Sequence, residues 1–440
     1  MKKVIIIGIP GVILVLGCLA LASVVTNNLI EKNFSTFAAK VAKQLNIELK
    51  DIRYESSLTG ATAYTTIQAT GLAEQLQFKL KHKICTFPIY SKIDGSRGLA
   101  FAYAKSTISE DNFSLADLEQ IKAIFNNQTP VILETVVDYR GNYNLRLTVN
   151  PAEDRNKSQS FSGLSGNFKI SKDGTKISGQ AEIQSVKLES NEGAMKLTDL
   201  EANLVQTKNN AGFWIGSGDL KIAEIFGRSP IGEFKINQAG IQANLVDRST
   251  TLEYLIDFGI KEINMPNGLP LTIDSLDYHI NINSIDSLAT AKLLQALKDI
   301  QRQIQSGAAE ESDRFAKQFG AQNAESIDRL LRANPHMTQK LAIATSQGPL
   351  NLDLDLNFSG FPQDKSIGGI EAPEQLIQYI SGAFHAKSPL ALLLLTPLAP
   401  RLPTYQQQGL LKIEGDTALF HAALKDKHFT INEHPIPLPF

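Results

Sequence analysis

The chain has few of the residues that build disulfide frameworks or metal centres. Its 440 residues include only two cysteines, Cys18 and Cys85, and one tryptophan. If Cys18 lies within a membrane, Cys85 has no partner in the chain and a disulfide framework is excluded. The two cysteines also lack metal-ligand spacing. Cys85 lies in the alternating stretch HKICTFPIY, which predicts a buried and unreactive thiol.

The sequence also lacks an excess of either charge. Lys+Arg 43 against Asp+Glu 45 gives a formal net charge of −2. Nucleic-acid-binding proteins usually gather a basic surplus on one face or helix, so no nucleic-acid partner is expected. With 43% hydrophobic and 20% charged residues, the composition is that of a folded globular protein.

No catalytic or phosphate-binding motif is present. The seven histidines form no His-Glu-x-x-His pattern, GSGD lacks the Lys-Ser or Lys-Thr of a phosphate loop, and GLSG lacks the frame of a nucleophile elbow. Asp353 and Asp355 lie two residues apart and share a strand face, which is more typical of a solvated side than of an acid and base pair. His421, His428 and His434 are grouped near the C-terminus without a carboxylate to complete a metal site. We therefore expect no catalytic, cofactor-binding or metal-binding residues, no cofactor and no enzymatic activity.

An uncharged run near the N-terminus has three interpretations. Val4 to Val25 contains no charge, and at 1.5 Å per residue it makes about 33 Å of helix against a hydrocarbon core of about 30 Å. This favours an uncut membrane anchor. The alternatives are a lipoprotein cut before Cys18 and a signal peptide cut after Ala22. Lys2 and Lys3 place the N-terminus in the cytoplasm and send the rest of the chain across the membrane.

Alternating apolar and polar residues dominate the remainder. They predict strands at residues 47–69 and 76–95, and then a long antiparallel meander with one buried face from residue 131 to 284. Asp173-Gly174 is the clearest hairpin signal.

Five other segments have helical or short apolar patterns. An amphipathic helix is predicted at residues 27–46, and another at 114–127 with a capping box from Ser114 and Asp117 and an apolar face of Leu115, Leu118, Ile121, Ile124 and Phe125. A helical insertion at 285–335 presents Leu288, Ala291, Leu294 and Leu297 and ends at Pro335. A helix is predicted at 371–387. The apolar stretch SPLALLLLTPLAP after it is too short to span a membrane and is interpreted as a helix buried under the sheet, with a membrane-dipping or lipid-contacting segment as the alternative.

Several stretches resemble those of the YdgA-like family of bacterial envelope proteins. They are the N-terminal run, YESSLTGATAYTTI, KHKICTFPI, SLDYHININSIDSLATAKLLQAL and the ending HFTINEHPIPLPF. The resemblance implies an inner-membrane-tethered protein with a large β-rich periplasmic part, and it implies no reaction.

These observations predict an α+β protein in four parts: a transmembrane anchor at 1–27, a periplasmic β-rich domain at 28–284, a helical insertion at 285–335, and strands and a helix at 336–440 that complete the sheet. The predicted function is non-catalytic: a single-pass inner-membrane protein that binds a lipid or other apolar ligand on a curved sheet. The alternative is a structural or assembly factor of the envelope that contacts itself or another envelope protein.

Overall fold

The computed structural model describes residues 47–57, 60–69, 77–85, 89–91, 97–230, 232–264, 271–305, 312–367 and 373–437. The chain divides into two compact units, Met1–Val205 (unit 1) and Gln206–Phe440 (unit 2). Each unit contains an antiparallel sheet with few helices, which confirms the predicted α+β class and the antiparallel meander.

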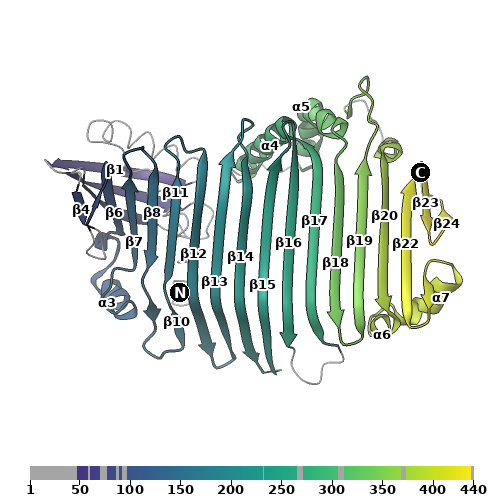
Figure 1. Cartoon of the computed structure of the whole chain (residues 1–440), viewed down its shortest axis with the longest axis horizontal. Helices are drawn as coiled ribbons and strands as arrows, with labels where there is room; N and C mark the ends of the chain where they lie inside the picture. The colour runs from purple at the N-terminus through teal and green to yellow at the C-terminus, as the bar shows by residue number, and fades with distance from the viewer. Residues whose placement is uncertain are drawn as a thin grey trace. The chain divides into compact units, whose positions relative to one another are not determined.

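The described part of unit 1 is built on a meander of antiparallel strands with a helix beside it (Figure 1). Along the sheet, β1 (Ile47–Ser57), β2 (Gly60–Ala69), β3 (Gln77–Cys85), β6 (Ala102–Ile108), β7 (Val131–Val137), β8 (Tyr143–Val149), β11 (Leu164–Ile170) and β12 (Lys176–Ser190) pair in that order. The short strands are β4 (Ile89–Ser91) with β5 (Arg97–Leu99), and β9 (Ala152–Glu153) with β10 (Gln159–Phe161). The remaining elements are η2 (Glu110–Asn112), α3 (Leu115–Ile124) and β13 (Gly193–Lys208).

The hairpin predicted at Asp173-Gly174 is confirmed between β11 and β12. Gly174 has φ of +70°, a conformation that glycine adopts without strain. The Asp173 carboxylate accepts hydrogen bonds from Ser171 Oγ and from the backbone and hydroxyl of Thr175. The hydrogen bond from Ser171, and then those from Thr175, lower the pKa of Asp173 to about 2, so the turn keeps its charged acceptor over the whole physiological pH range.

The helix predicted at 114–127 is α3. The backbone N–H of Asp117 donates to Ser114 Oγ over 3.2 Å, which confirms Ser114 as the N-cap. The predicted apolar face is only partly correct. Ile121, Ile124 and Phe125 pack on a core that includes Leu133, Leu147 and Val149, whereas Leu115 is 83% exposed. The first turn of α3 therefore projects beyond the sheet that its last turn covers.

A buried histidine joins three strands of unit 1. His82 on β3 lies directly opposite Ser106 on β6, and its ring contacts two hydroxyls: Nδ1 is 2.9 Å from Ser106 Oγ and Nε2 is 2.9 Å from Thr65 Oγ1 on β2. All three side chains are buried. Burial lowers the pKa of His82 from 6.5 to about 4, because the charged ring would lose its hydration. His82 is thus a neutral hydrogen-bonding residue of the core at neutral pH.

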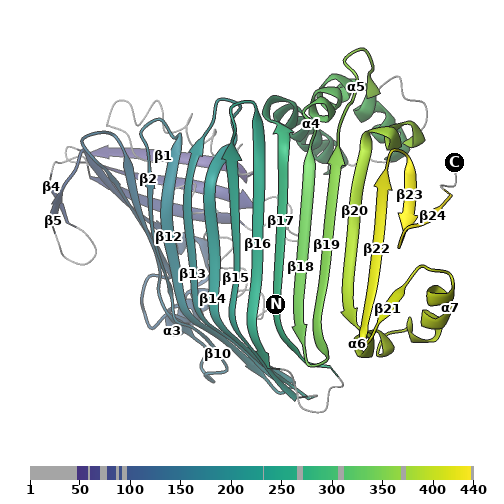
Figure 2. The ribbon, with the colours of Figure 1, turned by 45° about the vertical axis from the view of Figure 1, so that its right-hand side comes forward.

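Unit 2 is a longer sheet in which each strand pairs mainly with the next (Figures 1 and 2). Its strands are β14 (Trp214–Ser229), β15 (Gly232–Asp247), β16 (Thr251–Asn264), β17 (Ile273–Asp286), β18 (His336–Thr345), β19 (Gly348–Phe358), β20 (Ile380–Pro389), β21 (Lys412–Glu414), β22 (Thr417–Lys425), β23 (His428–Ile431) and β24 (His434–Ile436). β17 pairs with β18 although two helices separate them in the sequence. β20 pairs with β22, and β21 pairs with the same part of β22.

The two helices between β17 and β18 are α4 (Ser287–Gln305) and α5 (Ser312–Arg332), which lie together at one end of the strands (Figures 1 and 2). Three of the four apolar residues named for this stretch in the sequence do not face the protein. Leu288, Leu294 and Leu297 are 48%, 43% and 50% exposed. The side of α4 that faces the protein carries Ala289, Leu293, Ala296 and Ile300, which are spaced three and four residues apart. Ala289 is buried and the other three are half-buried. Both faces of α4 are apolar, so periodicity alone could not choose between them.

Asp286 fixes the start of this helical pair. One carboxylate oxygen accepts from the Ala289 backbone N–H over 2.8 Å and caps α4, and the other accepts from Arg329 Nε of α5 over 2.7 Å. Asp286 is buried at the end of β17, so a single carboxylate holds both helices to that strand.

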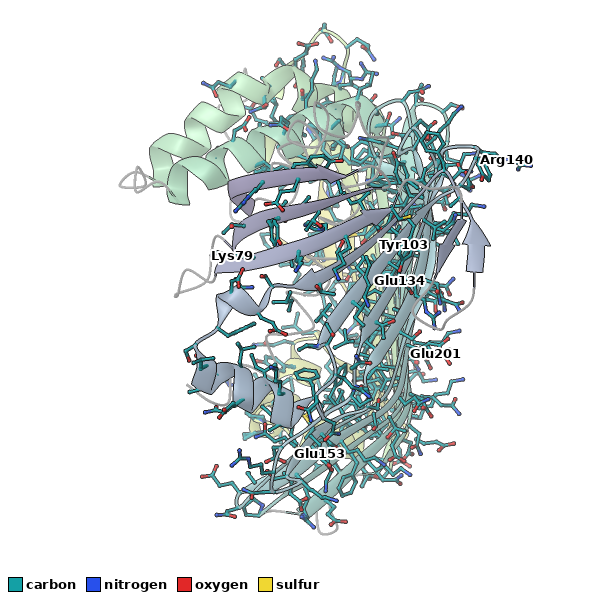
Figure 3. All side chains as sticks on the ribbon, turned by 90° about the vertical axis from the view of Figure 1, so that its left-hand side faces the viewer. Lys79, Tyr103, Glu134, Arg140, Glu153 and Glu201 are labelled. Atoms are coloured by element: carbon teal, nitrogen blue, oxygen red, sulfur yellow. The ribbon has the colours of Figure 1, made fainter. Side chains whose placement is uncertain are left out.

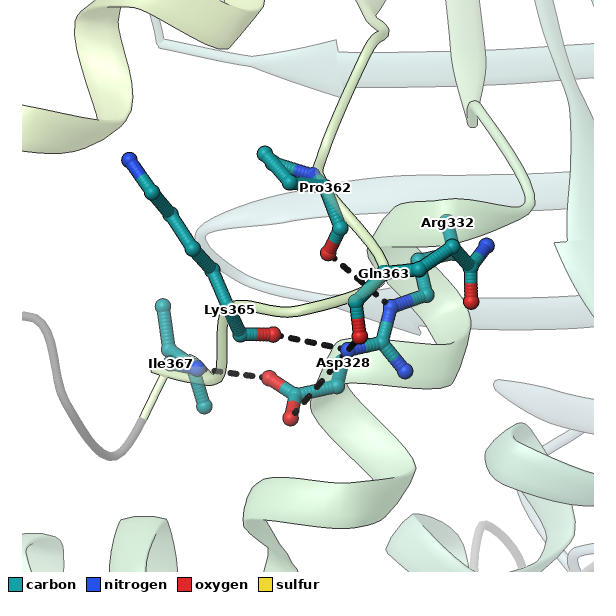
Figure 4. Close-up of polar contacts among 6 residues, drawn as sticks. All are labelled: Asp328, Arg332, Pro362, Gln363, Lys365 and Ile367. Atoms are coloured by element: carbon teal, nitrogen blue, oxygen red, sulfur yellow. Dashed lines mark hydrogen bonds and ion pairs between the residues drawn. The ribbon is translucent and has the colours of Figure 1, made fainter.

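The last turns of α5 also bind the segment that follows β19 (Figure 4). Arg332 donates to the carbonyl oxygens of Pro362, Gln363 and Lys365, the last over 2.7 Å. Asp328 accepts from the Ile367 backbone N–H over 2.6 Å. These bonds satisfy backbone groups in a stretch without regular structure.

Two predictions for the C-terminal part are wrong. Residues 371–387 were expected to be helical, but only a 3₁₀ segment, η4 (Pro373–Tyr379), precedes strand β20. Ile380, Gly382, Phe384 and Ala386 alternate with polar or small residues, and pairing with β19 and β22 on both sides decides the conformation. In SPLALLLLTPLAP only a short helix forms, α6 (Leu390–Leu394); Leu392 is buried, but Leu394, Leu395 and Leu398 are exposed. The segment continues through η5 (Ala399–Arg401) into α7 (Leu402–Gln407).

The expected anchor at 1–27 and the expected helix at 27–46 lie outside the described residues. Within the described part of the chain, no helix is long and apolar enough to cross a membrane. The four-part division of the chain stays a prediction.

Candidate functional site

The alternation of each unit 2 strand separates its side chains into two faces of opposite character. Residues directly opposite one another in an antiparallel sheet point to the same side, so the strand register defines rows that run across the sheet. The central row of one face crosses eight strands, from β14 to β22: Leu220, Ile241, Phe258, Tyr278, Leu341, Leu352, Ala386 and Phe420.

Two further rows on the same side complete what we call the apolar face. They are Gly218, Ala243, Ile256, Ile280, Gln339, Leu354, Phe384 and Ala422, and then Leu245, Tyr254, Ile282, Met337, Leu356, Gly382 and Leu424. None of these side chains is charged. Of the few polar groups, the Tyr278 hydroxyl donates to Gln339 Oε1 over 3.2 Å. The apolar face is therefore continuous across the described strands.

This face is apolar without being a core. None of its residues is fully buried, and Ile241 is 41% exposed. The expectation of one buried face in the meander is thus wrong for the part of the meander that lies in unit 2. Isolated exposed apolar side chains are ordinary, but a contiguous apolar surface on a folded protein usually marks a contact with a ligand, a membrane or another protein.

The opposite side of the same strands, the polar face, carries the charges. Its central row reads Asp219, Gln242, Asp257, His279, Lys340, Asp353, His385 and His421. His279 Nδ1 lies 2.5 Å from Asp257 Oδ1, and the rings of His385 and His421 stack with centroids 4.1 Å apart. Neighbours of opposite sign along such a row stabilise strand pairing.

Of the carboxylates and histidines singled out in the sequence, Asp353, Asp355, His421 and His428 lie on this side and are dispersed. His434 pairs with Ile431, whose partner Ala422 belongs to the apolar face. Asp353 and Asp355 share the polar face, as predicted, while Leu352, Leu354 and Leu356 lie on the other. Asp355 contacts His336 over 3.1 Å. His421 pairs with His385 and not with His428 or His434, which lie on β23 and β24. Among the described residues, no group of three or more His, Cys, Asp or Glu could hold a metal ion. Cys85, on β3 of unit 1, is half-buried.

The sequence contained the signal for the apolar face but not its extent. Runs such as LDLDL predict one apolar and one polar side for a single strand. Whether the apolar sides of β14 and β22 lie on the same face depends on the register of every strand between them, including the pairing of β17 with β18 across the helical insertion.

The fold and this site define an antiparallel β-sheet protein whose long unit has one continuous apolar face and one charged face. The chain belongs to a bacterial protein family of unknown function, DUF945, whose family model matches residues 1–439. No curated protein and no solved structure matched the chain. The narrower resemblance to YdgA-like proteins stays a prediction.

Proposed function

We propose that the protein is a non-catalytic bacterial envelope protein that binds a lipid or a similar acyl-chain ligand on the apolar face of unit 2. Two observations together carry the proposal. Three rows without a charged residue cross seven or eight strands, and no side chain in these rows is fully buried. Covering such a surface with an acyl chain removes apolar area from water at about 25 cal/mol per Å².

The proposal includes an inner-membrane location with the described part of the chain in the periplasm. Its support is the uncharged run from Val4 to Val25 behind Lys2 and Lys3. An anchor of this kind would keep the apolar face close to a source of lipid.

A photoactivatable fatty acid tests where the ligand binds. The full chain is purified, loaded with a diazirine-bearing palmitate and irradiated, and labelled peptides are mapped by mass spectrometry. We expect labels on β16 to β20 at residues of the apolar face. Labels spread evenly over both faces, or confined to unit 1, would overturn the proposal.

A matched pair of variants on one strand sharpens this test. Leu354→Glu introduces a carboxylate into the apolar face, and Asn351→Glu introduces the same charge on the polar face of β19. We expect Leu354→Glu to reduce labelling about tenfold, since a charge in contact with an acyl chain costs at least about 1.4 kcal/mol of binding. Asn351→Glu should label as the unmodified chain does.

A second candidate function is supported by α4. Its exposed leucines, Leu288, Leu294 and Leu297, could contact a second copy or another envelope protein, as expected of a structural or assembly factor. Site-specific photocrosslinking from position 294 in cells tests this function. A crosslinked partner that disappears in Leu297→Gln would support it, and a purely monomeric pattern would oppose it.

A further inference from the structure

Unit 1 contains a cavity of about 730 Å³ that the apolar face of unit 2 does not involve. Two cross-strand rows supply most of its walls. One row is Glu134 on β7, Arg146 on β8, Asn167 on β11 and Gln180 on β12; the other is Val136, Asn144, Lys169 and Ser178 on the same strands. Asn203 and Val205 of β13 complete the wall. The volume lies within the range of roughly 300–1,000 Å³ that small-molecule sites occupy.

Side-chain amides dominate the polar groups of this cavity. Asn144, Asn167, Gln180 and Asn203 each offer a carbonyl acceptor and two N–H donors, and Ser178 adds a hydroxyl. Within the described part of the chain, the amides of Asn144, Asn167 and Gln180 have no hydrogen-bond partner in the protein. They are therefore available to a ligand that both donates and accepts.

The charged side chains of the cavity are few, and two of them face each other. Arg146 lies directly opposite Glu134, a buried carboxylate that accepts a hydrogen bond from the Tyr103 hydroxyl over 2.8 Å. Figure 3 shows Tyr103 and Glu134 beside each other. The lining thus contains one carboxylate, Glu134, and two cations, Arg146 and Lys169, against four amides.

The same walls argue against an acyl chain and against an extended peptide. Val136 and Val205 are the main apolar side chains on this side, and Val205 is 61% exposed. A peptide usually adds to the free edge of a sheet, where backbone groups are unpaired, whereas this cavity lies on the face of paired strands and offers side chains. A neutral ligand rich in hydroxyl groups matches amides that donate and accept, and its C–H groups can contact the valines.

We propose that this cavity is a binding site for a neutral carbohydrate of the oligosaccharide class. Asn167 and Gln180, which are neighbours in the row that begins at Glu134, hydrogen-bond its hydroxyls, and Val205 packs against a ring face. The site is independent of the proposed lipid site, because its residues all belong to unit 1.

Saturation-transfer NMR on the full chain tests the proposal with maltotriose and chitotriose as probes. At about 10 mM probe, above the roughly 1 mM dissociation constant that a few hydrogen bonds support, we expect transfer from the protein to at least one trisaccharide. Absence of transfer to both trisaccharides would overturn the proposal. Displacement of a bound trisaccharide by trialanine or by inorganic phosphate would overturn the assigned ligand class.

Variants locate the binding. Asn167→Leu with Gln180→Leu should weaken trisaccharide binding about tenfold or more, since two hydrogen-bonding groups are lost. The matched control is Asn351→Leu with Gln242→Leu on the polar face of unit 2, which should bind as the unmodified chain does. Unchanged binding by the first pair would overturn the site. If that pair fails to fold, Gln180→Leu alone decides, because Gln180 is exposed and its replacement leaves the core intact.

Discussion

In unit 1, side chains on the core side of the sheet, such as Ala63, Leu133 and Val149, are almost completely buried. In unit 2, the strands have the same alternation, and their apolar face carries Leu220, Ile241 and their row neighbours. None of these side chains is fully buried. Alternation therefore specifies which side of a strand is apolar, and burial of that side requires a second layer. In unit 1, Ile121 and Ile124 of α3 and the next residue, Phe125, supply part of this second layer. The described helices of unit 2 instead lie at the ends of its strands (Figures 1 and 2).

Truncation of one leucine in each unit should give the largest difference. Leu147→Ala removes a buried side chain from the core of unit 1, and we expect a loss of about 2–5 kcal/mol in the free energy of unfolding of that unit. Leu352→Ala on the apolar face should cost about 1 kcal/mol, because its side chain is already partly hydrated. Hydrogen exchange resolved by peptide measures each unit separately. Equal losses would show that the apolar face is a true core.

Acid should weaken unit 1 through His82. Its folded pKa of about 4 lies below the unfolded value of 6.5, so the unfolded chain takes up the proton first as pH falls. Stability from this group is complete above pH 6.5 and decreases by about 3 kcal/mol as pH falls to 4. Denaturant titrations at pH 7 and pH 4.5 measure the loss. In His82→Gln this pH dependence should disappear, and in the exposed control His279→Gln it should persist.

The helical pair of unit 2 should depend on Asp286. Asp286→Ala removes the cap of α4 and the partner of Arg329, and we expect a cost of about 2 kcal/mol, confined to the two helices and the end of β17. Faster hydrogen exchange in residues 287–305 is the readout. Asp286→Asn retains an acceptor for the cap and should lose less. Uniform acceleration across unit 2 would contradict a local role.

The smallest effect is expected for an exposed ion pair. Arg248 contacts Glu253 over 2.7 Å, and Glu253→Gln should change the stability of unit 2 by no more than about 0.5 kcal/mol, because solvent and salt screen the charges. Thermal unfolding at low and high salt measures it. A larger loss would indicate that the turn between β15 and β16 contributes more to the sheet than its neighbours do.

Local features were predictable from the sequence because their causes are local. Ser114 caps α3, Asp173-Gly174 forms its hairpin, and Asp353 and Asp355 share a face, each within a few residues of its determinants. Strand β20 was mistaken for a helix because its conformation depends on pairing with β19 and β22. Neither strand belongs to the segment whose pattern was interpreted.

The two candidate sites were hidden for a related reason. The apolar face arises only when eight strands align, and the cavity of unit 1 gathers amides from strands separated by long stretches of chain. No spacing rule relates Asn144 to Gln180 before the register is known. His82 gave no signal either, since its two hydroxyl partners, Thr65 and Ser106, come from the two strands that flank its own.

Each strand of unit 2 pairs mainly with its immediate neighbours in the sequence. This pattern determines how the number of strands in such a sheet can change. From β15 to β19 each strand contributes one residue to every row and pairs only with the strands on either side. Duplication or deletion of a whole hairpin would thus widen or narrow the surface by two residues per row while leaving the remaining pairs in register. The capacity of the surface is then set by the number of hairpins in the array, and a ligand of a different length could be accommodated without redesign of any single strand.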